Sequence, residues 1–74
     1  MISKTSVMFG TKLKMLMVER GLTYSQLEKL TGISDSSLHR YAEGQVEIPL
    51  KSAKTIASHF NKTVDEMIYE REYS

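Results

Sequence analysis

The sequence predicts an all-α fold, a compact bundle of five short helices. Three observations support this prediction: apolar residues recur at helical spacing, the helical stretches begin at residues suited to helix starts, and no stretch alternates apolar and polar residues like a half-buried strand. A chain of 74 residues fits one domain, and so small a domain buries only about 60% of the surface that its unfolded chain exposes. We expect residues 1–74 to form a single domain whose core lies between about residues 7 and 69.

The first helix is predicted to run from about residue 7 to Arg20. Four apolar residues fall at the i, i+4, i+7 and i+8 positions of one helix face: Phe9, Leu13, Leu16 and Met17. Gly21 follows directly, and glycine is typical just after a helix end.

The second helix is predicted over Tyr24 to Thr31. Thr23 and Gln26 have the spacing of a capping box, in which the threonine oxygen accepts from the amide three residues on and the glutamine reaches back. Gly32 ends this helix, because a residue without a Cβ enters the left-handed conformation easily.

The third helix is predicted over Asp35 to Glu43. Ser34 is a good N-cap, and Gly44 closes the helix. An extended link follows, since Ile48 precedes proline and is therefore disfavoured in helical conformations.

A fourth and a fifth helix complete the bundle. Asn61 is a plausible stop for the fourth, and Thr63 with Glu66 forms a second capping box that starts the fifth at Val64. Beyond Tyr69 we expect a frayed tail or a dimer contact. The apolar positions of the fourth helix are Leu50, Ala53, Ile56, Ala57 and Phe60.

The charge of the chain is unevenly distributed. Residues 1–64 carry nine Lys and Arg against five Asp and Glu, whereas residues 65–74 carry one Arg against four acidic residues. A basic body with an acidic end fits phosphate contact on one face, and it equally fits ordinary solvated charge.

Several function classes have no support in the sequence. The chain has no cysteine, and its two histidines, His39 and His59, are expected on different helices without neighbouring ligands, so we expect no metal, no cofactor and no enzymatic activity. The longest apolar runs are far shorter than the roughly 20 residues of a membrane span. We expect a soluble protein of the cytoplasm.

The segment "TGISDSSLHRYAEG" carries the most functional information. Its short join contains Gly32 and sets the second and third helices at a steep angle, so that the start of the third helix protrudes. Ser34, Asp35 and Ser36 lie at that start, with Arg40 about a turn further along the exposed side. Short polar side chains let a helix approach the base edges of a DNA major groove closely.

Three segments in this order resemble the Cro and phage-repressor family of helix-turn-helix proteins, also called the xenobiotic-response-element type. "FGTKLKMLMVERGLT" is similar to the family's first helix and turn, "SQLEKLTGISDSSLHRYAEG" to its helix-turn-helix, and "IASHFNKTVDEMI" to its closing pattern. The resemblance covers about residues 9–68 and implies a lambda-repressor-like DNA-binding domain.

The resemblance also implies roles for individual residues. The residues implied to read bases are Ser34, Asp35, Ser36, His39 and Arg40. Those implied to contact phosphates are Tyr24, Ser25, Gln45, Lys51 and Ser52.

Three of these residues have alternative roles. Asp35 can instead stabilise the first turn of its helix. Tyr24 replaces the family's usual glutamine and can instead serve in packing, and His39 can equally be a solvated surface residue.

One departure from the family concerns a buried ion pair. The family commonly pairs an arginine of the first helix with a glutamate near the end of the third, and here Met17 and Ala42 occupy those places. Replacing both partners by apolar groups is tolerable, because no charge is left buried alone. We therefore expect Met17 and Ala42 to touch.

Two functions remain open. The first is a sequence-specific double-stranded DNA-binding regulator, a repressor that binds a pseudo-palindromic operator as a homodimer and is encoded by a phage, mobile element or bacterium. The second keeps the fold as a protein-binding module, of the antitoxin or repressor-partner type, with weak DNA binding. By resemblance, the residues expected at the dimer interface are Ile68, Tyr69 and Tyr73.

Overall fold

A computed structural model describes residues 2–69 of the chain, and the predictions for the tail, including Tyr73, lie outside the described residues. The described part is all-helical, as the sequence predicts. It contains α1 (Lys4–Arg20), α2 (Tyr24–Thr31), α3 (Asp35–Ala42), α4 (Leu50–His59) and α5 (Val64–Ile68).

The helix starts and stops follow the predicted caps closely. Both capping boxes are formed, and Asn61 adopts the left-handed conformation with φ 59°. The predicted start of the first helix at about residue 7 is wrong: α1 begins at Lys4, because the side chain of Ser3 accepts a hydrogen bond from the amide of Ser6. Helix α3 ends one residue earlier than predicted, with Glu43 as its C-cap.

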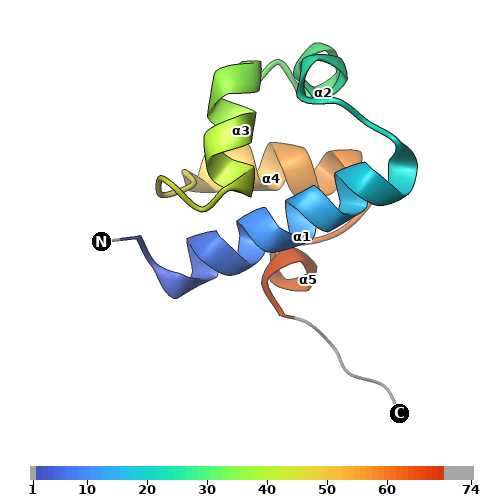
Figure 1. The fold of residues 1–74 in the computed structure, drawn as a ribbon. Coiled ribbons are helices and arrows are strands. Elements are labelled where there is room, and N and C mark those ends of the chain that lie inside the picture. The colour runs from blue at the N-terminus through green and yellow to red at the C-terminus, as the bar shows by residue number, and fades with distance from the viewer. Residues whose placement is uncertain (1, 70–74) are drawn as a thin grey trace.

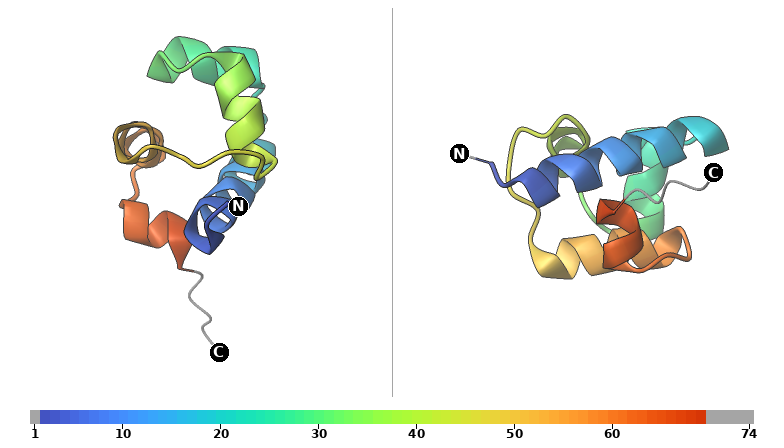
Figure 2. Two further views of the ribbon diagram at one scale, coloured as in Figure 1. Left: turned by 90° about the vertical axis from the view of Figure 1, so that its left-hand side faces the viewer. Right: turned by 90° about the horizontal axis from the view of Figure 1, so that it is seen from below.

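The helices are arranged around α1. In Figure 1, α1 crosses the front of the molecule, α3 rises above it, α5 lies below it and α4 runs behind. The two turned views in Figure 2 agree with this order, since α1 and α4 lie on opposite sides in both. Helices α2 and α3 meet at a steep angle at the top, where Gly32 has φ 81°.

The core lies between these helices and takes at least one fully buried side chain from each of them. Leu13 comes from α1, Leu27 from α2, Leu38 from α3, Ile56 from α4 and Met67 from α5. Removing all five from water gives the domain its main stabilisation, because each buried aliphatic side chain contributes about 1.5–3 kcal/mol. Helix α3 packs directly on α1 and α2, so these two helices set its orientation.

Gly10 sets how closely α1 and α3 approach. A Cβ added at this position would lie 2.0 Å from the carbonyl oxygen of Tyr41. That oxygen belongs to the last turn of α3, a rigid backbone group that cannot rotate away as a side chain does. Only glycine lets the backbone of α1 pass at this distance, so Gly10 fixes the crossing of the two helices.

We predict that Gly10→Ala destabilises the fold by about 3 kcal/mol or more, because relief of the clash requires a backbone shift. Alanine favours a helix over glycine by about 1 kcal/mol, which offsets only part of the cost. Urea unfolding measures the difference. Lys54→Ala, at an exposed position of α4, is the control; a Gly10→Ala variant as stable as that control would contradict the crossing.

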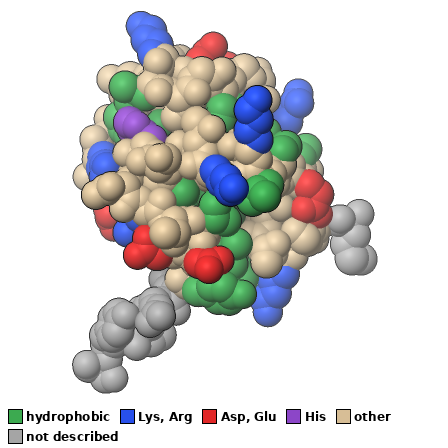
Figure 3. Space-filling model, turned by 180° about the vertical axis from the view of Figure 1, so that it is seen from behind, with side chains coloured by type: hydrophobic (Ala, Val, Ile, Leu, Met, Phe, Trp, Pro, Cys, Tyr) green, Lys and Arg blue, Asp and Glu red, His purple; other side chains and the backbone are tan. Residues whose placement is uncertain are grey.

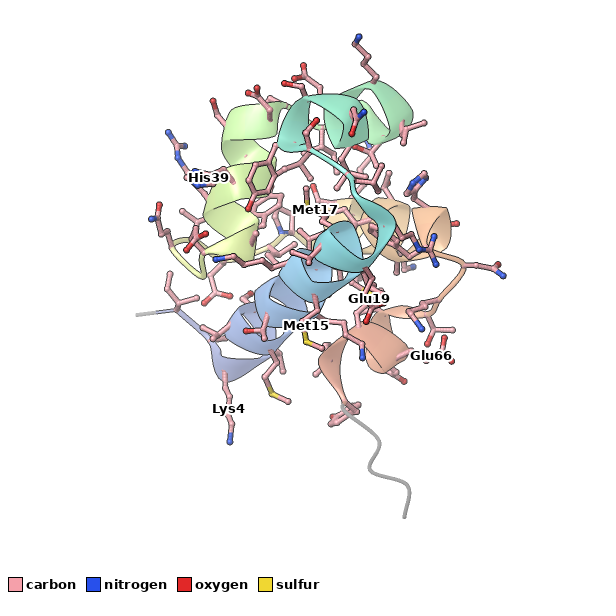
Figure 4. All side chains as sticks on the ribbon, turned by 45° about the vertical axis from the view of Figure 1, so that its right-hand side comes forward. Lys4, Met15, Met17, Glu19, His39 and Glu66 are labelled. Atoms are coloured by element: carbon pink, nitrogen blue, oxygen red, sulfur yellow. The ribbon has the colours of Figure 1, made fainter. Side chains whose placement is uncertain are left out.

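Met17 and Ala42 are both buried in the common core. Figure 4 shows Met17 near the middle of the molecule rather than at its surface. Their burial agrees with the predicted replacement of the family's ion pair, and the direct contact between the two side chains stays a prediction.

We predict that Ala42→Glu destabilises the fold by about 3 kcal/mol, because it buries a carboxylate without a partner. The double variant Met17→Arg/Ala42→Glu is expected to regain at least about 1 kcal/mol relative to the sum of the single changes. Urea unfolding of the four proteins measures this coupling. Strictly additive effects would show that the two positions are not neighbours.

Candidate nucleic-acid interface

The outer face of α3 presents polar side chains to solvent. Leu38 and Tyr41 of this helix are buried against the core, whereas Asp35, Ser36 and Arg40 are exposed. The amide of Asp35 donates to Oε1 of Glu28 over 3.2 Å, which ties the start of α3 to α2. The polar face of α3 is therefore held at a fixed angle to α2.

Ser34 has a structural role at the start of α3. Its Oγ accepts from the amide of Ser37 over 3.2 Å and donates to Oγ of Ser37 over 3.0 Å. The hydroxyl proton and one lone pair are thus used inside the helix cap, and one lone pair is left to accept from a base. Among the predicted base-reading residues, Ser34 has the least free hydrogen-bonding capacity.

His39 and Tyr24 connect α3 with α2. Their rings meet edge to face with centroids 5.0 Å apart and an interplanar angle of 71°. Burial raises the pKa of the Tyr24 hydroxyl above its usual value, and the nearby Glu43 carboxylate raises it further. Tyr24 therefore stays neutral and keeps its O–H as a donor suited to a phosphate oxygen.

An ion pair joins α1 to the end of α3 next to these rings. Nζ of Lys14 lies 2.9 Å from Oε2 of Glu43. Their hydrogen bond and charge attraction raise the pKa of Lys14 and lower that of Glu43. No local pattern in the sequence predicts this pair, because the two residues are 29 positions apart. It neutralises a carboxylate that would otherwise repel phosphate.

The loop between α3 and α4 is fastened to the start of α1. Oε1 of Glu47 accepts from the hydroxyls of Ser3 and Ser6, each over 2.8 Å, and its second oxygen accepts from the amide of Ser3. The amide of Ile48 donates to Oγ of Ser6 over 3.1 Å. The second half of the loop therefore has a fixed position relative to α1.

The predicted phosphate contacts flank α3 on two sides. Ser25 is exposed in the first turn of α2, Gln45 is exposed on the fastened loop, and Lys51 is exposed in the first turn of α4. Ser52 is half-buried beside it. Pro49 gives α4 no side-chain cap, so the first amides of α4 are available to an anion.

The residues predicted at the dimer interface lie at the end of α5, away from α3 (Figure 1). Ile68 is half-buried and Tyr69 is 61% exposed.

Within residues 2–69, no group of three potential metal-ligating residues comes together. The ring of His59 packs edge to face on Phe60. None of the described helices is long and apolar enough to cross a membrane.

We predict that the Glu47 fastening makes stability depend on pH. The hydrogen bonds from Ser3 and Ser6 lower the pKa of Glu47 below 4.5, so its stabilisation is present above pH 4.5 and is lost as the pH falls through the lower, folded-state pKa. As the pH is lowered from 6, the temperature of thermal unfolding should therefore fall less steeply for the Glu47→Gln variant than for the unchanged chain. Asp65→Asn, which removes an exposed acid of α5, is the control; equal slopes for Glu47→Gln and the unchanged chain would contradict the fastening.

Comparisons with known proteins agree with this arrangement. A family profile described as helix-turn-helix matches residues 13–67. The SPbeta prophage-derived uncharacterized HTH-type transcriptional regulator YopO of Bacillus subtilis (strain 168) is 33% identical over 60 residues, which cover 81% of this chain and 86% of that protein. No solved structure matches the chain significantly. The chain belongs to the helix-turn-helix family of the Cro and phage-repressor type.

Proposed function

We propose that this protein is a sequence-specific double-stranded DNA-binding regulator of transcription that inserts α3 into the major groove. The observation that carries the proposal is the exposed polar face of α3, with Ser36 and Arg40, on a helix fixed by the core behind it. The name of its Bacillus relative as a transcriptional regulator supports the same function. The proposal assigns the chain no catalytic step.

Each proposed base contact follows from side-chain chemistry. Arg40 pairs bidentately with a guanine, a contact worth about 1–3 kcal/mol of discrimination. Ser36 bonds to a base edge, and Asp35 accepts from a cytosine amine or stabilises the first turn of α3. His39, held by the ring of Tyr24, lies beside these positions.

The proposed phosphate contacts position α3 without reading sequence. Tyr24 donates its hydroxyl from the start of α2, and Lys51 brings a positive charge to the uncapped start of α4. The others are Ser25, Gln45 and Ser52. Contacts on both sides of α3 would hold the helix in the groove at one register.

We further propose that the protein is a repressor that binds a pseudo-palindrome as a homodimer. A domain of this size contacts one half-site, and two copies place their α3 helices in major grooves one helical turn apart. The prophage origin of the relative supports a phage or mobile-element origin, with the protein acting in the bacterial cytoplasm. We expect Ile68, Tyr69 and Tyr73 at the dimer interface.

A second candidate function is protein binding by the same fold. Asp35, Glu43 and Glu47 lie on or next to the proposed DNA face, and carboxylates oppose phosphate contact. Lys14 neutralises Glu43, and the serines hold Glu47 toward α1, so we rank DNA binding first.

Selection from a randomised duplex pool at physiological salt tests the proposal. We expect the unchanged protein to enrich a pseudo-palindrome. Arg40→Ala should bind this sequence about 5- to 150-fold more weakly and relax the preference at one position of each half-site, because one bidentate contact is lost.

The matched control is Lys62→Ala, which removes one positive charge from the turn between α4 and α5, outside both the α3 face and the proposed dimer interface. This variant should weaken binding little and relax no position. No enrichment by the folded, unchanged protein, or the same relaxation in both variants, would count against DNA reading by α3.

A further inference from the structure

Helix α1 carries apolar side chains on two sides, although only one side faces the core. On the other side, Val7, Met15 and Val18 are 42%, 43% and 76% exposed. Single exposed apolar residues are ordinary, but these three lie on one face of one helix. We call Val7, Thr11, Met15 and Val18 the outer stripe.

Thr11, at the centre of the outer stripe, also presents apolar surface. Its hydroxyl donates to the carbonyl oxygen of Val7 over 3.0 Å, so the polar end of the side chain is used inside the helix. Figure 1 shows α1 crossing the front of the molecule, with α3 and α5 to its two sides. The stripe lies between the end of α3 and α5, which cover part of it, and the apolar surface that stays exposed marks an interaction surface.

Opposite charges lie at the two ends of the outer stripe. Lys4 comes one turn before Val7, and Glu19 directly follows Val18; both are exposed. Figure 4 shows Lys4 and Glu19 toward opposite ends of α1, with Met15 between them. One end of the stripe is therefore basic and the other acidic.

The stripe is symmetric about Thr11. Val7 lies four residues before it and Met15 four residues after it, while Lys4 and Val18 lie seven residues before and after. If two α1 helices cross antiparallel at Thr11, Val7 of each copy meets Met15 of the other. Lys4 then lies beside Glu19 of the second copy, at both ends of the contact.

We propose that the outer stripe binds the α1 helix of a second copy of this chain, antiparallel and crossing at Thr11. This inference rests on the homodimer of the proposed function and gives it a surface. A two-fold axis perpendicular to both α1 helices keeps the two α3 helices on the same side of the pair.

The stripe is continuous with the α5 residues that the sequence assigns to dimerisation. A hollow of about 130 Å³ lies beside it, lined by Val7, Met8 and Met15 of α1 and by Ile68 and Tyr69 at the end of α5. Ile68 and Tyr69 thus form the edge of the interface, and α1 forms its centre. One stripe from each copy gives a small interface, below about 1,200 Å², so we expect association at micromolar concentrations.

Charge reversal tests the antiparallel pairing. In sedimentation of the full chain over the micromolar range, Lys4→Glu and Glu19→Lys should each weaken self-association about tenfold or more, since each brings like charges together at both ends. A mixture of the two variants should associate better than either alone, because every end then joins Glu to Lys. The double variant should recover self-association.

Lys54→Glu is the matched control and should associate like the unchanged chain, because Lys54 is an exposed residue of α4, a helix on the opposite side of the bundle from α1 (Figure 2). Single variants that associate normally, or a mixture without heterodimers, would overturn the pairing. Met15→Glu supplies a second check, because a charge near the centre should abolish association of a chain that still folds by circular dichroism.

Binding to a duplex with a single half-site separates this inference from the proposed function. The Lys4→Glu variant should bind the half-site like the unchanged chain, because Lys4 lies outside the α3 face. An unchanged protein that binds the half-site but stays monomeric overturns the stripe alone. If the unchanged protein forms a dimer that binds no DNA, and the Lys4→Glu variant no longer dimerises, the result supports the stripe and overturns the proposed function.

Discussion

The close approach of α1 and α3 at Gly10 is the constraint on which the rest of the structure depends. A side chain there would meet the carbonyl oxygen of Tyr41, so the missing Cβ lets the last turn of α3 lie directly on α1. Leu13, Leu38 and Ile56 then close the core around this crossing. Because α3 is short, its own backbone hydrogen bonds give it little stability, and its direction is set by what it packs against. Because the apolar side of α3 packs on the core in this direction, its polar side faces solvent.

Two polar fastenings complete the support of the proposed DNA face. Lys14 holds Glu43 at the end of α3, and Ser3 with Ser6 holds Glu47 in the loop that follows. Both fastenings use an acidic residue that lies close to the expected path of phosphates. Binding these carboxylates to α1 gives them satisfied partners and reduces their repulsion of DNA. Helix α1 thus supports the site on its inner side, while its outer stripe remains free for a second copy.

The sequence predicted the elements well and the contacts between them poorly. Capping boxes, glycines and apolar spacing act within a few residues, so they gave the helix starts at Tyr24, Asp35 and Val64 and the stop at Asn61. Gly10 and the Glu47 fastening depend on residues that are distant in the sequence, and no local pattern reports them. Most of the proposed site residues are exposed, whereas Tyr24 and Ser52 are half-buried; their roles toward DNA stay predictions.

The measurement that tests the central claim most directly is a titration of the labelled protein with a short duplex at low salt, followed by amide NMR. Non-specific binding through phosphates is strong enough to observe there. If α3 is the reading helix that α1 and the loop support, the largest shifts fall in the first turn of α2, along α3, and between Gln45 and Ser52, while α5 changes little. Shifts confined to α5 and the outer stripe, or none at all, would contradict the account.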